Sequence, residues 1–154
     1  MLQRLDLSQN SFTDSIPDEL GTLSQLELLM LSENKLSGNI PAALGNLSRL
    51  IDLQMGGNLL SGGMPAELGA LTVLQIALNL SHNVLSGRIP PQLGNLIMLE
   101  ILLLNNNDLS GEIPSTFSNL SSLLACNFSY NDLSGPLPSG GLFQNMAESG
   151  FIGN

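Results

Sequence analysis

The sequence predicts an α/β solenoid, in which one coil is repeated six times, with a parallel inner β-sheet and short helical turns on the outer face. Two observations predict it. Asparagines recur at intervals of 24, 24, 25, 24 and 24 residues, and a fixed period of about 20 to 50 residues is typical of stacked repeats. The same letters surround them, as in "NKLSGNIPAALGNL" from Asn34 and "NVLSGRIPPQLGNL" from Asn83. Each coil should bury the apolar face that its neighbour cannot bury alone.

The inner sheet is predicted from an L-x-L pair in each coil. A period of two indicates a short strand with one buried face, and coils that all run in one direction place their strands in parallel. The expected strands are Leu5–Leu7, Leu29–Leu31, Leu53–Met55, Leu78–Leu80, Leu102–Leu104 and Cys126–Phe128. The fourth coil holds one extra residue within "QIA", between Leu74 and Leu78. We expect a bulge just before its strand.

An asparagine follows each strand, at the point where the chain turns inward. A buried turn leaves backbone groups in need of partners, and a carboxamide offers two donors and an acceptor. We therefore predict a structural ladder of asparagine side chains between coils. Its members are Asn10, Asn34, Asn58, Asn83, Asn107 and Asn131.

The rest of each coil is predicted to be a return segment. Gly38 and its counterparts suit a tight bend, and Pro41 and its counterparts fix φ and donate no hydrogen bond, which disfavours a central strand. The following "LGNL" predicts a 3₁₀ or loop turn on the outer face. The six coils occupy residues 1–141. Residues 142–154 lose the repeat and form a C-terminal tail, which we expect to serve as a partial cap.

Composition excludes several classes of function. The net charge is −9 with only four Lys and Arg residues, so there is no basic patch for nucleic acid. No apolar run reaches the roughly 18 residues of a membrane span, and the N-terminus does not resemble a signal peptide.

The single histidine, His82, lacks partners for a catalytic triad or a metal site. Cys126 replaces a strand leucine and should be a buried, inert thiol. We predict no enzyme, cofactor or metal site.

The repeat also carries a family resemblance. The unit LxxLxLxxNxLSGxIPxxLGxL, from Leu2 to about Gly141, resembles the plant-specific class of leucine-rich repeat. The stretch from "ALNLSHNVLSGRIPPQLGNL" to "FIGN" resembles the last ectodomain repeats of plant leucine-rich-repeat receptor-like serine/threonine kinases. The resemblance implies a right-handed solenoid outside the plasma membrane, acting in signalling during growth or defence. It also implies a peptide, protein or steroid ligand on the inner face and a co-receptor ectodomain near the C-terminal end.

The chain lacks other features of that family: a signal peptide, a cysteine-bearing cap, a membrane-spanning helix and kinase motifs. We therefore expect a segment of a receptor or a shortened product, without kinase activity and without direct membrane insertion. One alternative is a secreted or free leucine-rich-repeat protein that resembles plant inhibitors of cell-wall-degrading enzymes. A structural segment with no activity of its own is a further alternative.

Candidate partner-binding residues flank the buried strand leucines or precede a ladder asparagine. They are Leu28, Met30, Asp52, Gln54, Ile101, Leu103 and Tyr130. Exposed apolar side chains often mark contact sites, although isolated surface leucines are also ordinary. Four sequons predict glycosylation in a secreted chain, at Asn46, Asn79, Asn119 and Asn127. The first and third fall in return segments, whereas Asn79 and Asn127 fall on the inner face, where a glycan would obstruct a ligand.

Overall fold

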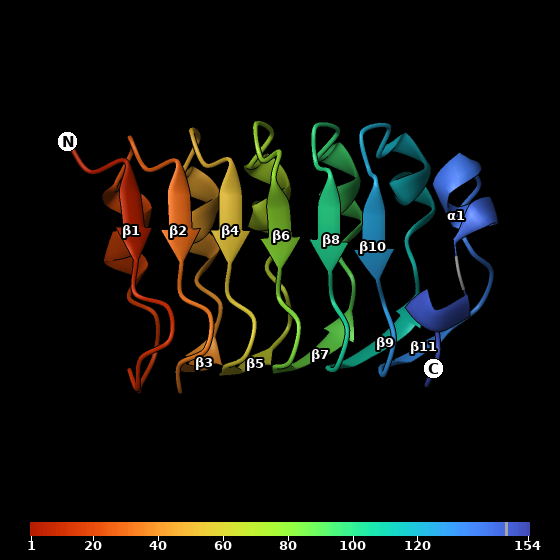
Figure 1. The fold of residues 1–154 in the computed structure, drawn as a ribbon, viewed down its shortest axis with the longest axis horizontal. Helices are drawn as coiled ribbons and strands as arrows, with labels where there is room; N and C mark the ends of the chain where they lie inside the picture. The colour runs from red at the N-terminus through yellow and green to blue at the C-terminus, as the bar shows by residue number, and fades with distance from the viewer. Residues whose placement is uncertain (147) are drawn as a thin grey trace.

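The computed structural model describes residues 1–146 and 148–154. Six short strands lie side by side in one parallel sheet, here called the inner sheet (Figure 1). Its strands are β1 (Arg4–Asp6), β2 (Leu28–Met30), β4 (Asp52–Gln54), β6 (Ala77–Asn79), β8 (Ile101–Leu103) and β10 (Ala125–Asn127). Their order in the sheet follows their order in the chain, and the coils advance as a right-handed solenoid. The predicted fold class is confirmed.

Each inner strand begins and ends one residue earlier than predicted. The pairing continues past the strand ends, because the Leu7 N–H still donates to the Met30 carbonyl at 2.8 Å. The extra residue of the fourth coil lies just before β6, as predicted. There the N–H groups of Gln75 and Ile76 both donate to the Ile51 carbonyl, at 3.1 and 2.8 Å, and the regular register resumes at Ala77.

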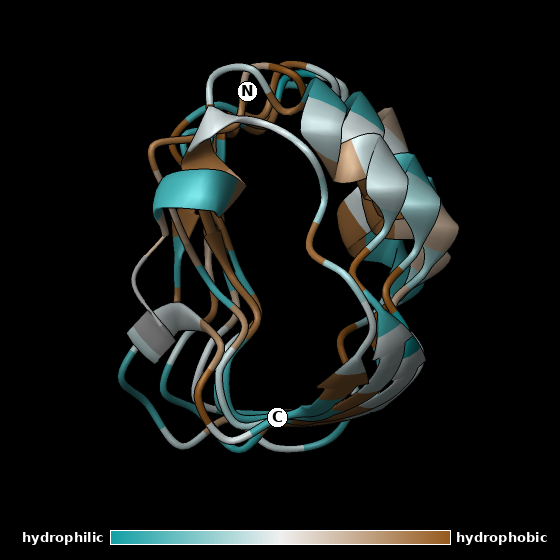
Figure 2. Cartoon of the chain, turned by 90° about the vertical axis from the view of Figure 1, so that its right-hand side faces the viewer, coloured by the Kyte–Doolittle hydropathy of each residue, from teal (hydrophilic) through white to brown (hydrophobic). Residues whose placement is uncertain are grey.

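Five short 3₁₀ helices form the opposite side of the coils (Figure 2). They are η1 (Asp18–Thr22), η2 (Ala42–Asn46), η3 (Ala66–Ala70), η4 (Pro91–Asn95) and η5 (Ser115–Asn119), and each follows a proline. Stacking of these turns requires glycine: a Cβ on Gly69 would collide with the backbone carbonyl of Gln92 in the next coil. The same position in η5 is Ser118, and no further 3₁₀ turn of this kind stacks beyond η5 among the described residues.

The return segments form a second parallel sheet that the sequence analysis did not predict. Its strands are β3 (Ser37–Asn39), β5 (Leu59–Gly62), β7 (Val84–Arg88), β9 (Asp108–Glu112) and β11 (Asp132–Ser134). The prolines stand beyond these strands and do not interrupt their hydrogen bonds. The repeat glycines, such as Gly87, have φ between 73° and 79°. These left-handed residues bend the segments without ending the pairing.

The core between the two sheets and the 3₁₀ turns is mainly aliphatic, with Phe117, Phe128 and Phe143 at its C-terminal end. Leu29, Leu53, Leu78 and Leu102, one from each successive central strand, are fully buried. They belong to a single hydrophobic cluster that runs through the coils. Fully burying a leucine side chain contributes roughly 1.5–3 kcal/mol, so the stack is stabilised without a large aromatic content.

The asparagine side chains connect successive coils. The Asn58 Nδ2 donates to the carbonyls of Met55 in its own coil, at 3.2 Å, and Leu31 in the preceding coil, at 3.0 Å. Its Oδ1 accepts from the Leu36 N–H at 3.1 Å. Asn34, Asn83, Asn107 and Asn131 repeat this geometry. The Asn10 side chain donates only within its own coil.

The C-terminal residues continue the repeat instead of merely covering it. After α1 (Gly141–Asn145) and η6 (Glu148–Gly150), the Phe128 N–H donates to the Gly150 carbonyl at 2.8 Å. Asn154 then occupies a seventh ladder position, since its Oδ1 accepts from the Leu133 N–H and its Nδ2 donates to the Phe128 carbonyl, both at 3.0 Å. The Phe151 ring stacks on Phe128, with centroids 5.9 Å apart.

Candidate protein-binding surface

The exposed face of the inner sheet, here called the inner face, carries most of the candidate binding residues. Strand residues alternate, so Leu53 points into the core while Asp52 and Gln54 lie on the inner face. Leu28, Met30, Ile101 and Leu103 are half-buried on the same face. This alternation follows from the period-two pleat of a strand.

The strand register arranges these residues in two rows that cross the sheet. The first row runs Leu28, Asp52, Ala77, Ile101, and the second runs Met30, Gln54, Asn79, Leu103. Two apolar pairs therefore face solvent, one on β2 and one on β8. They are not adjacent, because β4 and β6 lie between β2 and β8 (Figure 1). Three of the four inner-face residues on β4 and β6 are polar, and Asp52, Gln54 and Asn79 are here called the polar strip.

A chain of hydrogen bonds holds the polar strip in place. The Gln54 Nε2 donates to the Asp52 Oδ1 at 2.9 Å, and the Asn79 Nδ2 donates to the Gln54 Oε1 at 3.0 Å. The Asn79 Oδ1 in turn accepts from the Ser81 N–H at 3.0 Å and from its hydroxyl at 2.7 Å. Both amide groups are thus fixed in orientation. Sequence reasoning missed this chain, because it links residues 25 positions apart.

Asp52 is more buried than its place on a solvent-facing sheet suggests. Its exposed fraction is only 6%, and its side-chain hydrogen bond comes from the neutral Gln54. Desolvation raises the pKa of the Asp52 carboxyl, and the Gln54 hydrogen bond partly opposes this rise. By contrast, hydrogen bonds from Ser8 lower the pKa of the exposed Asp6 carboxyl.

A left-handed residue precedes every ladder asparagine at the lower edge of the inner face. Glu33, His82 and Tyr130 have φ of 58°, 53° and 57°, which is uncommon for residues other than glycine. The turn presents their side chains to solvent, and all three are exposed. Tyr130 lies beside the last inner strand, so the structure places it away from the Leu28 and Met30 pair.

The four sequons occupy two different environments. Asn46 and Asn119 are the last residues of η2 and η5, and both are exposed. Asn79 and Asn127 are half-buried in strands β6 and β10. In each strand the carboxamide oxygen accepts from the serine two residues later, and the Asn79 amide nitrogen is also engaged.

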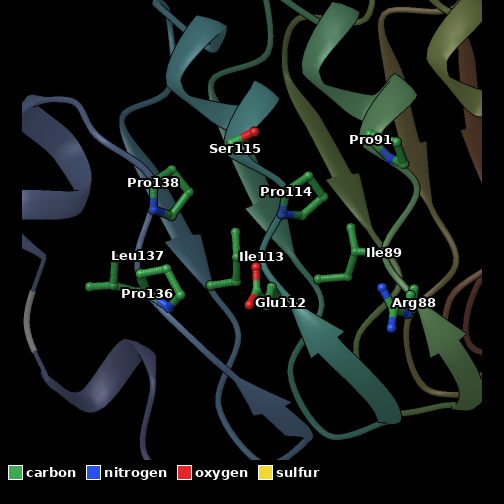
Figure 3. A pocket seen from close by; sticks show the side chains of 10 residues that line it. All are labelled: Arg88, Ile89, Pro91, Glu112, Ile113, Pro114, Ser115, Pro136, Leu137 and Pro138. Atoms are coloured by element: carbon green, nitrogen blue, oxygen red, sulfur yellow. The ribbon is translucent and has the colours of Figure 1, made fainter.

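A separate hollow lies on the side of the solenoid, between the second sheet and the 3₁₀ turns (Figure 3). Its volume is about 330 Å³, and prolines from three successive coils, Pro91, Pro114 and Pro138, line it. Arg88 and Glu112 stand at its lower rim (Figure 3). The hollow is open and repeats the Ile-Pro spacing of the coils, so packing of the return segments explains it.

Among the described residues, the side chains that could react chemically do not gather into one site. Burial raises the pKa of the Cys126 thiol to about 12, and its sulfur lies 3.8 Å from the Met146 sulfur. His82 is exposed, with one ring nitrogen 3.5 Å from the Asn105 amide. Within residues 1–146 and 148–154, no three histidine, cysteine or acidic side chains gather as metal ligands. In the same ranges, no helix has the length and apolar character needed to span a bilayer.

Comparisons with known proteins agree with this geometry. Two leucine-rich-repeat family models match the chain, one over residues 1–60 and the other over residues 76–96 and 98–120. A comparison with curated protein sequences gives no match. Many solved structures are similar, and three from Arabidopsis represent them well.

The ectodomain of the plant membrane receptor kinase GASSHO1/SCHENGEN3 of Arabidopsis thaliana, in complex with CASPARIAN STRIP INTEGRITY FACTOR 2, has 42% identity and a TM-score of 0.93. The match covers 97% of this chain and 18% of that one. The Arabidopsis receptor kinase HAESA, in complex with the peptide hormone IDA and the co-receptor SERK1, has 43% identity and a TM-score of 0.88. That match covers 96% of this chain and 24% of HAESA.

The chain therefore spans about a fifth of the large ectodomains that it matches. It covers most of a smaller relative, the ectodomain of the receptor kinase SOBIR1 from Arabidopsis thaliana. Here the identity is 36% and the TM-score 0.80, and the match covers 86% of this chain and 73% of that one. The repeat, the solenoid and these similarities together place the chain in the leucine-rich-repeat family, in the group of plant receptor-kinase ectodomains.

Proposed function

We propose that this chain is a ligand- and co-receptor-binding part of a plant receptor-kinase ectodomain, acting in signalling on the outer side of the plasma membrane. Its role is to bind a peptide or protein, and it carries no catalytic chemistry of its own. The partners would be a peptide ligand on the inner face and a co-receptor ectodomain near the C-terminal end. HAESA, a relative at 43% identity, binds a peptide hormone together with a co-receptor.

The observation that carries the proposal is the contrast between the inner-face positions and the packed positions of each coil. Core leucines, ladder asparagines and turn glycines repeat from coil to coil because packing requires them. The inner-face positions do not repeat: the same register position is Leu28, Asp52, Ala77 and Ile101 in successive strands. A rigid scaffold whose inner-face side chains differ from coil to coil suits specific recognition.

The two apolar pairs strengthen the case for binding. Leu28 with Met30 and Ile101 with Leu103 lie on strands that the core and the backbone hold rigidly. Apolar side chains on a rigid backbone require little ordering of the main chain on association. The similar structures support this function over that of a free inhibitor of cell-wall-degrading enzymes, because GASSHO1/SCHENGEN3, HAESA and SOBIR1 are all receptor kinases.

Glycosylation at the sequons belongs to the same proposal. A chain that folds outside the cell would carry glycans first at Asn46 and Asn119, which are exposed on the outer face. Asn79 and Asn127 remain candidates, although their side chains lie within the inner sheet. Peptide mass spectrometry of the chain secreted from plant cells measures the occupancy of each sequon.

The test of binding is selection from a displayed library of random-sequence peptides on the folded chain. We expect recovered peptides to lose binding to Leu103→Arg, which places a long charged side chain on the inner face. The matched control is Asn95→Arg, which places the same side chain at the exposed end of η4. A recovered peptide should also promote association with the SERK1 ectodomain. Failure to recover any peptide, or equal losses in both variants, would overturn the proposed function.

A further inference from the structure

Asp52 is the one ionisable side chain among the buried polar residues of the described chain. The Asp52 side chain does not point into the hydrophobic core, because Leu53 is the core residue of the same strand. It lies instead on the inner face, with the apolar Leu28 beside it on β2 and the small Ala77 beside it on β6. A carboxylate in such a place loses hydration without gaining a countercharge, which is unfavourable unless something else compensates.

Among the described residues, none that flanks Asp52 on the inner face carries a positive charge. The one ion pair within the described residues joins Arg4 and Asp6 on β1, at 3.9 Å. The inner-face residues that flank Asp52 on its own and the adjacent strands are all uncharged: Leu28, Met30, Gln54, Ala77 and Asn79. The chain as a whole has a net charge of −9, so its field attracts cations. Asp52 is thus a largely desolvated carboxylate that can still accept a hydrogen bond from a positively charged donor.

The hydrogen-bonded chain orients this carboxylate. Gln54 binds one oxygen, Oδ1, and is itself held by Asn79. The second oxygen, Oδ2, accepts no hydrogen bond from the described residues. An anion whose supporting groups are already fixed gains more from a charged donor than a mobile surface carboxylate does.

The distance between the two apolar pairs determines how far apart the apolar side chains of a bound peptide must be. Neighbouring strands are about 4.8 Å apart, so β2 and β8 are separated by about 14 Å. An extended peptide advances about 3.4 Å per residue, so side chains four residues apart match this distance. Alternate residues of an extended peptide share one face. The residue midway between the two apolar ones therefore points at the sheet between Asp52 on β4 and Ala77 on β6. The small Ala77 side chain leaves room for it.

We propose that Asp52 anchors a lysine or arginine side chain of an extended peptide that crosses β2, β4, β6 and β8. Apolar side chains two residues before and two residues after the basic residue rest on the Leu28/Met30 and Ile101/Leu103 pairs. This inference rests on the proposed function and specifies the ligand: a peptide with a basic residue between two apolar ones.

The same selected peptides test this inference. We expect enrichment of arginine or lysine with apolar residues at the second position on either side. A synthetic peptide of that pattern should bind Asp52→Asn about tenfold or more weakly than the unaltered chain, because a close, desolvated charge pair is lost. Replacing its basic residue with glutamine should weaken binding to the unaltered chain and leave binding to Asp52→Asn nearly unchanged.

The matched control is Asp108→Asn, which removes the same charge from an exposed site on β9 in the second sheet. Thermal unfolding checks integrity, and Asp52→Asn should melt no lower than the unaltered chain. Recovered peptides without a basic preference, or equal affinity of the two variants for the basic peptide, would overturn this inference and leave the proposed function standing. Recovery of no peptide at all would overturn both.

Discussion

The Asn58 side chain donates a hydrogen bond across the boundary between coils to the backbone carbonyl of Leu31, at 3.0 Å. It also accepts the Leu36 N–H of the preceding coil. Asn58→Ala would leave the buried Leu36 N–H without a partner and remove one of the two amide donors to the Leu31 carbonyl, the other being Asn34. We therefore expect a loss of about 1–3 kcal/mol in the free energy of unfolding. Asn10→Ala is the control, because the Asn10 side chain is exposed and donates only to carbonyls of its own coil. Urea unfolding measures both, and equal losses would contradict the ladder.

The stacked 3₁₀ turns predict a second difference between two matched substitutions. Gly69→Ala places a methyl group against the Gln92 carbonyl of the next coil. The coils would have to separate locally, so we expect destabilisation by about 1–3 kcal/mol. Ser118→Ala, at the same repeat position in η5, should change stability by only a few tenths of a kcal/mol. Thermal unfolding of the two variants decides this, and a neutral Gly69→Ala would show that the turns are not in close contact.

Much of this architecture is predictable from the sequence, because each repeated letter has a local physical reason. The spacing of Leu29 and Leu31 fixes a strand, and the interval between asparagines fixes the coil. The second sheet was not predicted, because glycine and proline within one coil indicate turns. Only the stacking of coils pairs segments such as β3 and β5. Asn154 was missed because the residues before it lose the repeat pattern, although it lies 23 residues after Asn131.

The sequence predicts which residues lie at the candidate site, but not how buried they are or how they bond to one another. Alternation placed Asp52 and Gln54 on the inner face, together with Leu28 and Ile101. It could not distinguish a wetted carboxylate from a buried one, since burial depends on neighbours in adjacent coils. The hydrogen bond from Asn79 to Gln54 likewise depends on the register between β4 and β6.

The desolvation of Asp52 predicts a pH dependence of stability. Its pKa is raised in the folded chain, so the folded state binds the proton more tightly than the unfolded state. The charged form therefore destabilises the fold, and this cost appears as the pH rises from the ordinary range of an aspartate through the raised pKa. We expect Asp52→Asn to gain stability relative to the unaltered chain between acidic and neutral pH. The free energies of unfolding of Asp52→Asn and of the unaltered chain should move apart as the pH rises. A difference that stays constant across this range, or narrows, would contradict the burial of an uncompensated charge.

Stability should also be graded along the polypeptide of residues 1–154. Leu5 and Leu7 are only half-buried, whereas Leu102 and Leu104 are fully buried. At the other end, Phe151 stacks on Phe128 and Phe143 is buried. Hydrogen exchange should therefore be faster at the amides of the first coil than at those of the fifth. Equal protection around Leu5 and Leu104 in the monomer would contradict this gradient.

Photo-crosslinking tests the central claim, that the inner face is the binding surface, most directly. A peptide selected on the chain would carry a benzophenone group next to its basic residue, and mass spectrometry would locate the attached protein residue. We predict crosslinks within β2, β4, β6 and β8, with competition by the unlabelled peptide. Crosslinks confined to the 3₁₀ turns, or to the hollow lined by Pro91, Pro114 and Pro138, would contradict the account.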